Sequence, residues 1–239
     1  MQSSEKVNSK RVCSYNQRNV SLSSSWRMCV GCGACEWACP EKSIILKNYL
    51  NDGIRPFVDE SICKSCGECL DVCPGINITR FSSISQSHIE RSLLEDWGPV
   101  LEVYEGYAAD EEIRYKGSSG GLATAIALYC MEKEGMEGAL HIGANPEVPW
   151  QNRTIFSKSK NSLVENLGSR YSPASPCNGL HFIEEASSPC VFIGKPCDVV
   201  ALRKASEKSE ALRNNLGLAI SIFCAGTPSS QGTLDMLKV

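Results

Sequence analysis

Short apolar stretches and amphipathic stretches take turns along the second half of the chain, from about residue 99 to residue 239. Apolar or alternating runs predict strands at residues 101–109, 138–143, 189–196 and 216–224. Longer segments with helical spacing predict helices at residues 122–134, 198–209 and 229–237, and a shorter one at 162–167. Residues 145–160 are polar and are expected to form a surface hairpin or loop. Strands that alternate with helices predict an α/β domain with a mostly parallel sheet.

The first part of the chain has a different pattern. Residues 1–26 are polar and rich in Ser, Asn and Gln, which is typical of a loosely ordered arm. Two β-prone pieces within residues 43–59 flank Asn51-Asp52-Gly53 and predict a hairpin. Residues 81–98 are Ser-rich and then amphipathic, which indicates a linker. We therefore expect an arm at 1–26, a small module at 27–80, a linker at 81–98 and an α/β domain at 99–239.

Eight cysteines of the small module form two runs with the same spacing. Each run reads Cys-x2-Cys-x2-Cys-x3-Cys-Pro, the ligand spacing of bacterial-type ferredoxins. The cysteines of the first run are Cys29, Cys32, Cys35 and Cys39, and those of the second are Cys63, Cys66, Cys69 and Cys73. Gly33 and Gly67 occupy matching positions and permit the left-handed backbone of a tight loop around a cluster. The duplication predicts an α+β, ferredoxin-like module with two 4Fe-4S clusters.

The fourth cysteine of each run is expected to bind the cluster of the other run, as in two-cluster ferredoxins. The ligands assigned to the first cluster are Cys29, Cys32, Cys35 and Cys73. The ligands assigned to the second cluster are Cys63, Cys66, Cys69 and Cys39. Structural zinc is the alternative, because Cys-x2-Cys pairs also bind zinc. Zinc does not explain the regular triplets or the two Cys-Pro endings, so the spacing favours iron–sulfur clusters.

Composition and charge narrow the possible partners. The chain has 239 residues, a formal net charge of −3 and no block of basic residues, which argues against a nucleic-acid partner. Eight of the 14 cysteines are committed to metal, which favours a reducing cytoplasm. The N-terminus lacks an apolar signal core, and the longest apolar run, residues 122–131, is far short of a membrane span. We expect a cytoplasmic protein that does not insert directly into a membrane.

A Gly-rich loop, Gly117 to Gly121, opens the helix predicted at residues 122–134. Free backbone N–H groups and the helix dipole make such a loop suitable for a phosphate, and Thr124 would add a hydroxyl on the first turn. The loop matches neither a Walker motif nor a Gly-x-Gly-x-x-Gly fingerprint. Phosphate or cofactor binding and a simple helix entry therefore both remain open.

Two cysteines outside the runs, Cys197 and Cys224, each lie just past the carboxyl end of a predicted strand. Sites of α/β sheets lie at this edge, so these two thiols are candidates for one metal centre. Cys130 and Cys190 are expected to be buried as small hydrophobic residues, and Cys177 is open between the two roles. The three histidines lack ligand spacing and are interpreted as structural or surface residues.

The α/β domain resembles the family of beta subunits of coenzyme F420 hydrogenases and dehydrogenases over roughly residues 100–239. The resemblance rests on EGYAADEEIR at 105–114, GSSGGLATA at 117–125, GSRY at 168–171, FIGKPCDVVALR at 192–203 and IFCAGTPS at 222–229. Members of this family are iron–sulfur flavoproteins. They bind FAD and pass electrons between clusters and a deazaflavin coenzyme or another two-electron acceptor. Several carry a two-cluster ferredoxin module at the N-terminus.

The resemblance implies a set of cofactor-binding residues. The family's Gly-rich segment near the flavin is matched by Gly117, Ser118, Ser119, Gly120, Gly121 and Thr124. A second family segment is matched by Gly168, Ser169 and Tyr171, with Arg170 in place of Lys. Cys197 and Cys224 match cysteines of a Gly-Thr-Pro-Cys and a Phe-Cys-x-Gly motif, with Lys195 replacing Thr. They are candidate ligands of a third 4Fe-4S cluster, whose ligand set is incomplete because a later Cys-x2-Cys segment is missing.

By this resemblance, the chain is expected to be an oxidoreductase subunit that relays electrons between 4Fe-4S clusters, FAD and a two-electron acceptor or donor such as coenzyme F420. A redox protein or subunit and a small-molecule redox coenzyme are the implied partners. The alternative is a non-catalytic ferredoxin-type relay with a degenerate α/β docking domain. Some relatives occur instead with chlorophyll metabolism or polysaccharide synthesis. Because the family usually continues further, we also expect an α/β domain that is incomplete at its C-terminus and binds flavin weakly.

Overall fold

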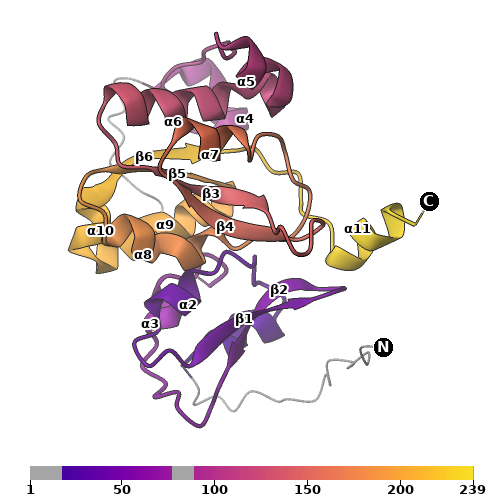
Figure 1. Ribbon diagram of the computed structural model, residues 1–239. Helices are drawn as coiled ribbons and strands as arrows, with labels where there is room; N and C mark the ends of the chain where they lie inside the picture. Colours follow the sequence, from indigo (N-terminus) through magenta and orange to yellow (C-terminus); the bar gives the residue numbers. More distant parts are fainter. Residues whose placement is uncertain (1–17, 77–88, 239) are drawn as a thin grey trace.

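The structure, a computed structural model, describes residues 18–76 and 89–238. Residues 18–76 form a cysteine module, and residues 89–238 form an α/β domain that packs against it (Figure 1). Most of the predicted N-terminal arm and part of the predicted linker, including His88 and Cys13, lie outside the described residues.

The cysteine module is built around the predicted hairpin. Its strands are β1 (Ile44–Tyr49) and β2 (Gly53–Val58), and its helices are α1 (Ser21–Ser25), α2 (Ala34–Ala38) and α3 (Glu68–Asp71). The strands are antiparallel, with Ile44 opposite Val58, which confirms the hairpin. Helices α2 and α3 begin directly after Gly33 and Gly67, whose φ angles are 90° and 88°. The left-handed backbone predicted at both glycines is therefore confirmed.

A four-stranded sheet forms the middle layer of the α/β domain. Its strands are β3 (Ala139–Ala144), β4 (Asn152–Ser157), β5 (Cys190–Gly194) and β6 (Leu216–Ser221). The spatial order is β4-β3-β5-β6. Strands β3, β5 and β6 pair in parallel, whereas β4 pairs antiparallel with β3. Because β4 follows β3 without a crossover helix, it returns in the opposite direction. The sheet is thus mostly parallel, as predicted, with one antiparallel edge strand.

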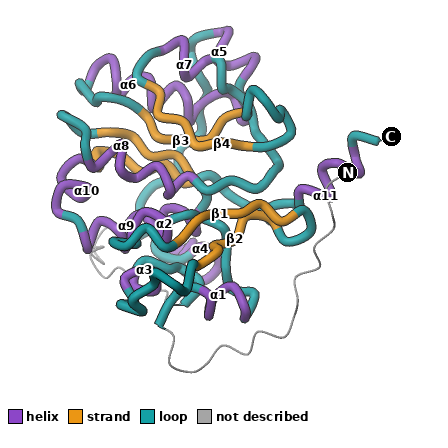
Figure 2. Tube along the Cα trace, turned by 60° about the horizontal axis from the view of Figure 1, so that its bottom comes forward, coloured by secondary structure: helices purple, strands orange, loops and turns teal. Residues whose placement is uncertain are grey.

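Helices cover both faces of this sheet (Figures 1 and 2). One face carries α5 (Glu111–Lys116), α6 (Leu122–Lys133) and α7 (Lys160–Val164), and the other carries α8 (Leu180–Glu184), α9 (Pro196–Lys208) and α10 (Glu210–Asn215). Successive strand residues point to opposite faces. Ala139 and Val191 accordingly pack with the first group of helices, and Leu140 and Phe192 pack with the second.

The remaining short elements lie around these layers. Among the described residues they are α4 (Leu94–Trp97), α11 (Ser230–Met236) and 3-10 helices at Arg91–Leu93, Ser118–Gly121 and Pro176–Gly179. Helix α11 lies beside the hairpin of the cysteine module, where the Gln231 N–H donates to the Leu50 carbonyl at 2.7 Å. The helices predicted at 122–134, 198–209 and 229–237 are confirmed within a few residues. In the described part of the chain, no helix is long and apolar enough to cross a membrane.

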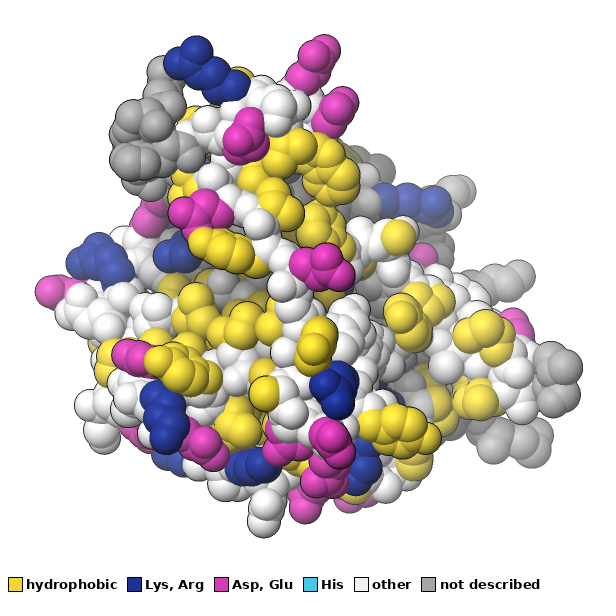
Figure 3. Space-filling view, turned by 90° about the horizontal axis from the view of Figure 1, so that it is seen from above, with side chains coloured by type: hydrophobic (Ala, Val, Ile, Leu, Met, Phe, Trp, Pro, Cys, Tyr) yellow, Lys and Arg dark blue, Asp and Glu magenta, His cyan; other side chains and the backbone are white. Residues whose placement is uncertain are grey.

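The strand predicted at residues 101–109 is wrong. The segment has an alternating sequence but forms no strand, and its residues 101–107 are exposed. Most of its side chains, such as Val103 and Tyr104, are exposed. Apolar side chains gather on the face of the molecule that is seen from above (Figure 3). Alternation alone does not form a strand, because a strand also needs a neighbour for its backbone hydrogen bonds. Conversely, β4 lies within the segment for which a hairpin or loop was predicted.

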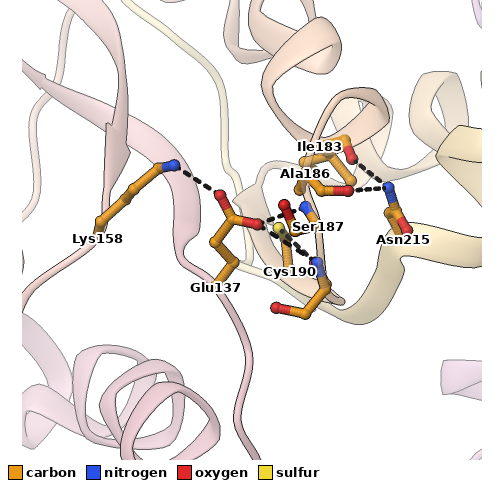
Figure 4. Close-up of polar contacts among 8 residues, drawn as sticks. Glu137, Lys158, Ile183, Ala186, Ser187, Cys190 and Asn215 are labelled. Carbon is orange, nitrogen blue, oxygen red and sulfur yellow. Dashed lines mark hydrogen bonds and ion pairs between the residues drawn. The ribbon is translucent and has the colours of Figure 1, made fainter.

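A polar network ties β3 and β5 to the end of α8 (Figure 4). The Asn215 side-chain amide donates to the carbonyl groups of Ile183, Glu184 and Ala186 at 3.1, 3.3 and 2.8 Å. It thereby satisfies carbonyl groups that the end of α8 leaves without helical partners. Nearby, the Glu137 carboxylate pairs with Lys158 at 2.6 Å and accepts from the Ser187 N–H at 2.6 Å. These contacts fix the loop that leads into β5.

The cysteine module and the α/β domain share a continuous core. Ala34 and Val72 of the module pack in one buried cluster with Leu180 and Leu202 of the domain. The Ser175 hydroxyl donates to the Gly31 carbonyl at 2.6 Å. The indole N–H of Trp37 donates to Glu184 at 3.1 Å, so this side chain lies at the interface. The side of the module that carries the first cysteine run is therefore covered by the domain.

Candidate functional site

Four thiols of the cysteine module gather on the side that faces the α/β domain. They are Cys29, Cys32, Cys35 and Cys73. Burial raises the pKa of the Cys35 thiol well above its ordinary value, and the nearby thiols of Cys32, Cys29, Cys73 and Cys69 raise it further. Cys73, from the second run, thus lies near the first three cysteines of the first run, as the crossed assignment requires, and that assignment stays a prediction.

The other four thiols gather at the opposite side of the module. Cys39, Cys63, Cys66 and Cys69 line one small cavity. Burial raises the pKa of Cys69 to about 11, and the thiols of Cys39, Cys66 and Cys63 contribute to the rise. The Asn19 amide donates to the Cys63 sulfur at 3.7 Å. This set combines three cysteines of the second run with the last cysteine of the first.

The chemistry of these two sets fits 4Fe-4S clusters. Each set offers four thiols, the number that one cubane binds. In the described residues, no three His, Cys, Asp or Glu side chains are placed to hold a single metal ion. Zinc would need all four sulfurs at about 2.3 Å from one point, whereas a cubane binds each thiolate at a different iron.

The two sets differ in their access to solvent. Cys32, Cys35 and Cys73 of the first set are buried, and only Cys29 is half-buried. In the second set Cys66 is exposed and Cys63 is half-buried. The α/β domain covers the first set and leaves the second set at the outer surface of the module.

A cavity of about 440 Å³ separates the first set from the edge of the α/β sheet. Cys29 and Arg55 line it from the cysteine module, and Lys195, Cys197 and Cys224 line it from the domain. Its size is within the range of small-molecule and cofactor sites. Cys197, at the start of α9 after β5, and Cys224, after β6, thus line the same cavity as Cys29, and their role as ligands of one metal centre stays a prediction.

A buried ion pair stands beside this cavity. The Lys195 ammonium lies 2.7 Å from Oδ2 of Asp198, and the Lys195 N–H donates to the same oxygen at 2.9 Å. Burial raises the pKa of Asp198, although Lys195 opposes the rise. Oδ1 of Asp198 has no hydrogen-bond partner among the described residues. Burial and the Asp198 carboxylate raise the pKa of Cys197 to about 11.

The Gly-rich loop lies away from the cavity. Its backbone is left-handed at Ser119, Gly120 and Gly121, which have φ angles of 50°, 67° and 70°. A Cβ atom on Gly121 would lie 2.5 Å from the Ile113 carbonyl oxygen, and one on Gly120 would lie 2.9 Å from the Tyr107 Cβ. These glycines are therefore required by packing against residues of the same domain, with or without a ligand.

The two segments assigned to a cofactor by resemblance do meet. The Ser169 N–H donates to the Ser118 hydroxyl at 2.8 Å, which joins residues 168–171 to the Gly-rich loop. Thr124 lies on the first turn of α6, and Tyr171 is exposed. None of the predicted cofactor-binding residues lines the cavity beside Cys29. Their role in binding FAD stays a prediction.

Arg55 and Asp198 were not singled out from the sequence: Arg55 lines the cavity, and Asp198 pairs with Lys195 of the cavity wall. Cys177, whose role the sequence left open, lies directly against Cys32. A hydrogen bond from the Cys177 thiol lowers the pKa of Cys32, and burial opposes this effect. The position of Asp198 directly after Cys197 is the one sequence signal that could have indicated its role. The proximity of Cys177 to Cys32 has no local signal.

Family models match most of the chain. Residues 28–75 match a 4Fe-4S dicluster domain. Residues 103–180 match the N-terminal part of the coenzyme F420 hydrogenase/dehydrogenase beta subunit, and residues 189–239 match its C-terminal part. The order of these matches is the order of the two parts of the structure.

The individual proteins that match this chain have low sequence identity to it. The chain is 26% identical to the coenzyme F420-dependent sulfite reductase of Methanocaldococcus jannaschii, over 74% of this chain and 25% of that protein. It is 23% identical to one polypeptide of the F(420)H(2) dehydrogenase of Methanosarcina mazei, over 82% of this chain and 53% of that polypeptide. The chain thus spans between about a quarter and about half of the length of these relatives.

The fold is also found in solved structures. An example is a chain of the xenon-derivatised F420-reducing [NiFe] hydrogenase complex from Methanosarcina barkeri. The two chains superpose with a TM-score of 0.50 and 21% identity, over 55% of this chain and 47% of the other. At this identity the similarity supports the fold alone.

Proposed function

Because the chain belongs to the family of coenzyme F420 hydrogenase/dehydrogenase beta subunits, we propose that it is an iron–sulfur electron-transfer subunit of an F420-dependent oxidoreductase. In this proposal the eight cysteines of the module hold two 4Fe-4S clusters in the crossed arrangement. A flavin, with FAD as the favoured candidate, or the deazaflavin coenzyme itself binds next to the first cluster.

The cavity beside Cys29 is the observation that carries this proposal. It is about 440 Å³ in volume, and one wall contains a thiol of the first set. A planar redox ring in this cavity would be adjacent to the first cluster, without protein layers between them. When bound, clusters exchange single electrons, and a flavin or deazaflavin exchanges two electrons as a hydride equivalent. The cavity thus joins a one-electron path to a two-electron site.

Solvent access suggests an order for this path. Cys66 of the second set is exposed, so the second cluster is the one that a redox partner can approach. The first set is buried under the α/β domain and adjoins the cavity. We therefore place the partner at the second cluster and the coenzyme at the first.

The cavity is lined by charges of both signs. Lys195 and Arg55 bring positive charge and Asp52 brings negative charge, and the two cations would stabilise a ring that becomes more negative on reduction. Asp198 holds the Lys195 side chain in place through the buried ion pair. Cys197 and Cys224 remain candidate ligands of a third cluster. Cys29, the other thiol that lines the cavity, is already assigned to the first cluster.

Binding measurements on the anaerobically purified chain test this proposal. Thr227 is an exposed residue of the cavity wall, so Thr227→Trp should fill the cavity without disturbing the core. We expect this variant to bind FAD and coenzyme F420 at least about tenfold more weakly than the parent, as measured by fluorescence quenching.

A matched variant distinguishes the cavity from the Gly-rich loop. Ser118→Ala removes the hydroxyl that accepts from Ser169 and leaves the cavity unchanged. Weaker binding in Ser118→Ala, with normal binding in Thr227→Trp, would move the coenzyme from the cavity to the loop. If the parent chain binds neither coenzyme while its clusters are intact, the non-catalytic relay becomes the better description.

A further inference from the structure

Lys204 of helix α9 lies in the interface between the α/β domain and the cysteine module. The residue is buried, with only 5% of its surface exposed. Its ammonium donates to the carbonyl oxygen of Cys73 at 3.1 Å, across 131 positions of sequence. Ala201, Leu202 and Ala205, which surround it on the helix, are completely buried in the shared core. The core therefore fixes the position of this charge.

Cys73 belongs to the first set of thiols, which we assign to the first cluster. Four thiolates around a cubane make such a site net negative, and each electron that enters adds one further negative charge. A positive charge fixed beside a ligand residue therefore stabilises the reduced cluster more than the oxidised one.

The second cluster provides an internal comparison. Cys39 and Cys73 occupy equivalent positions in the two runs, and their carbonyls accept the equivalent backbone N–H groups of Lys42 and Ile76, at 3.2 and 3.4 Å. In the described part of the chain, only Cys73 also receives a hydrogen bond from a buried lysine. The lysine is thus an addition by the α/β domain to one half of a duplicated module.

Arg55, which is half-buried, lies beside Cys29 and also favours negative charge at the first set. The other charged side chains near the clusters are exposed or paired. Arg18 and Lys64 line the cavity of the second set, but both are exposed, and Lys64 pairs with Glu41 at 2.6 Å. Exposed charges are largely screened by solvent and salt. Beside the first set, Asp198 and Lys195 have opposite effects on the Cys32 thiol and form an ion pair with each other.

We infer that Lys204 is a positioning residue: it holds a positive charge beside the first cluster, and this charge makes the first cluster easier to reduce than the second. The inference rests on the proposed function for its two clusters. It adds that electrons arriving at the exposed second cluster collect at the first cluster, next to the cavity. The domain that holds the cavity thereby sets the direction in which the module delivers electrons.

Anaerobic redox titration with dithionite, followed by electron paramagnetic resonance, tests this inference. Cys29→Ser and Cys66→Ser first assign the two cluster signals. We expect the first cluster of the parent chain to be reduced at the higher potential. In Lys204→Met, its reduced-to-oxidised ratio at a fixed potential should fall at least about tenfold, equivalent to about 59 mV for one electron. Lys204→Arg, which retains the charge, should restore most of this loss.

Lys208→Met is the matched control, because Lys208 lies one turn further along α9 and its ion pair with Asp71 is exposed. Lys208→Met should change the reduced-to-oxidised ratio of the first cluster less than twofold and leave that of the second cluster unchanged. Equal effects of Lys204→Met and Lys208→Met, or equal shifts of both clusters, would overturn the inference. If Lys204→Met does not fold, the potentials in the parent chain decide, and a lower potential for the first cluster refutes it. No coenzyme is present, so this result does not depend on coenzyme binding.

Discussion

Gly33 and Gly67 offer a comparison that the duplicated module itself supplies. They occupy matching positions and have nearly the same φ angle, 90° and 88°. Replacing either by Ala places a Cβ in a left-handed conformation, at a cost of about 1–2 kcal/mol. This backbone term is the same for both, so any difference between Gly33→Ala and Gly67→Ala must come from what the new Cβ touches.

The surroundings of the two glycines differ because only the first run faces the α/β domain. A Cβ on Gly33 would lie 2.9 Å from the Asn178 nitrogen and 3.0 Å from the Ser175 Cβ. Both contacts belong to the packed 3-10 helix at Pro176–Gly179 and the residue before it. A Cβ on Gly67 would lie 3.3 Å from the end of the Arg18 side chain, which can move away. Overpacking should therefore add about 1–3 kcal/mol to Gly33→Ala alone.

The apparent midpoint of thermal unfolding measures this difference. In a chain of this length, 1 kcal/mol corresponds to roughly 2–4 °C. We expect Gly67→Ala to lower the midpoint by roughly 2–8 °C, and Gly33→Ala to lower it by about 2–12 °C more. Both variants should be purified without air, with iron content measured beside each melt. Equal shifts at equal iron content, or a larger shift for Gly67→Ala, would refute the close packing between module and domain.

Three further predictions follow from other parts of the structure. Cys29→Ser and Cys73→Ser should remove the same cluster signal, and loss of different signals would contradict the crossed ligand sets. Asn215→Ala leaves three carbonyls at the end of α8 without their donor and should lower the free energy of unfolding by about 1–3 kcal/mol, whereas Asn214→Ala at the exposed neighbour should change it little. Burial lowers the pKa of His141 below its ordinary value of 6.5. As the pH drops from about 7.5 towards the lowered pKa, the unfolded chain therefore binds this proton before the folded chain does, and the free energy of unfolding falls. His141→Gln should flatten this part of a plot of unfolding midpoint against pH, and an unchanged slope would exclude the histidine as its source.

The sequence by itself determined the local parts of this protein. The cysteine spacing indicated two groups of four thiols, because the ligands of one cluster loop are near neighbours in the chain. Gly33 and Gly67 predicted left-handed turns, since the conformational preference belongs to the residue itself. The hairpin and the long helices α6 and α9 were predictable for the same reason. Their hydrophobic periods and turn residues act over a few positions.

The tertiary structure decided which of these parts meet. Residues 101–109 have the alternation of a strand but form no strand, because pairing depends on a neighbour that the segment does not contain. The sequence placed Cys197 and Cys224 at strand ends, yet only the docking of the module brings Cys29 opposite them. Lys204 has the helical spacing of an ordinary surface lysine, and it meets Cys73 across 131 positions. Contacts of this kind arise from the packing of whole layers, whose energies sum over many distant residues and leave no period in the sequence.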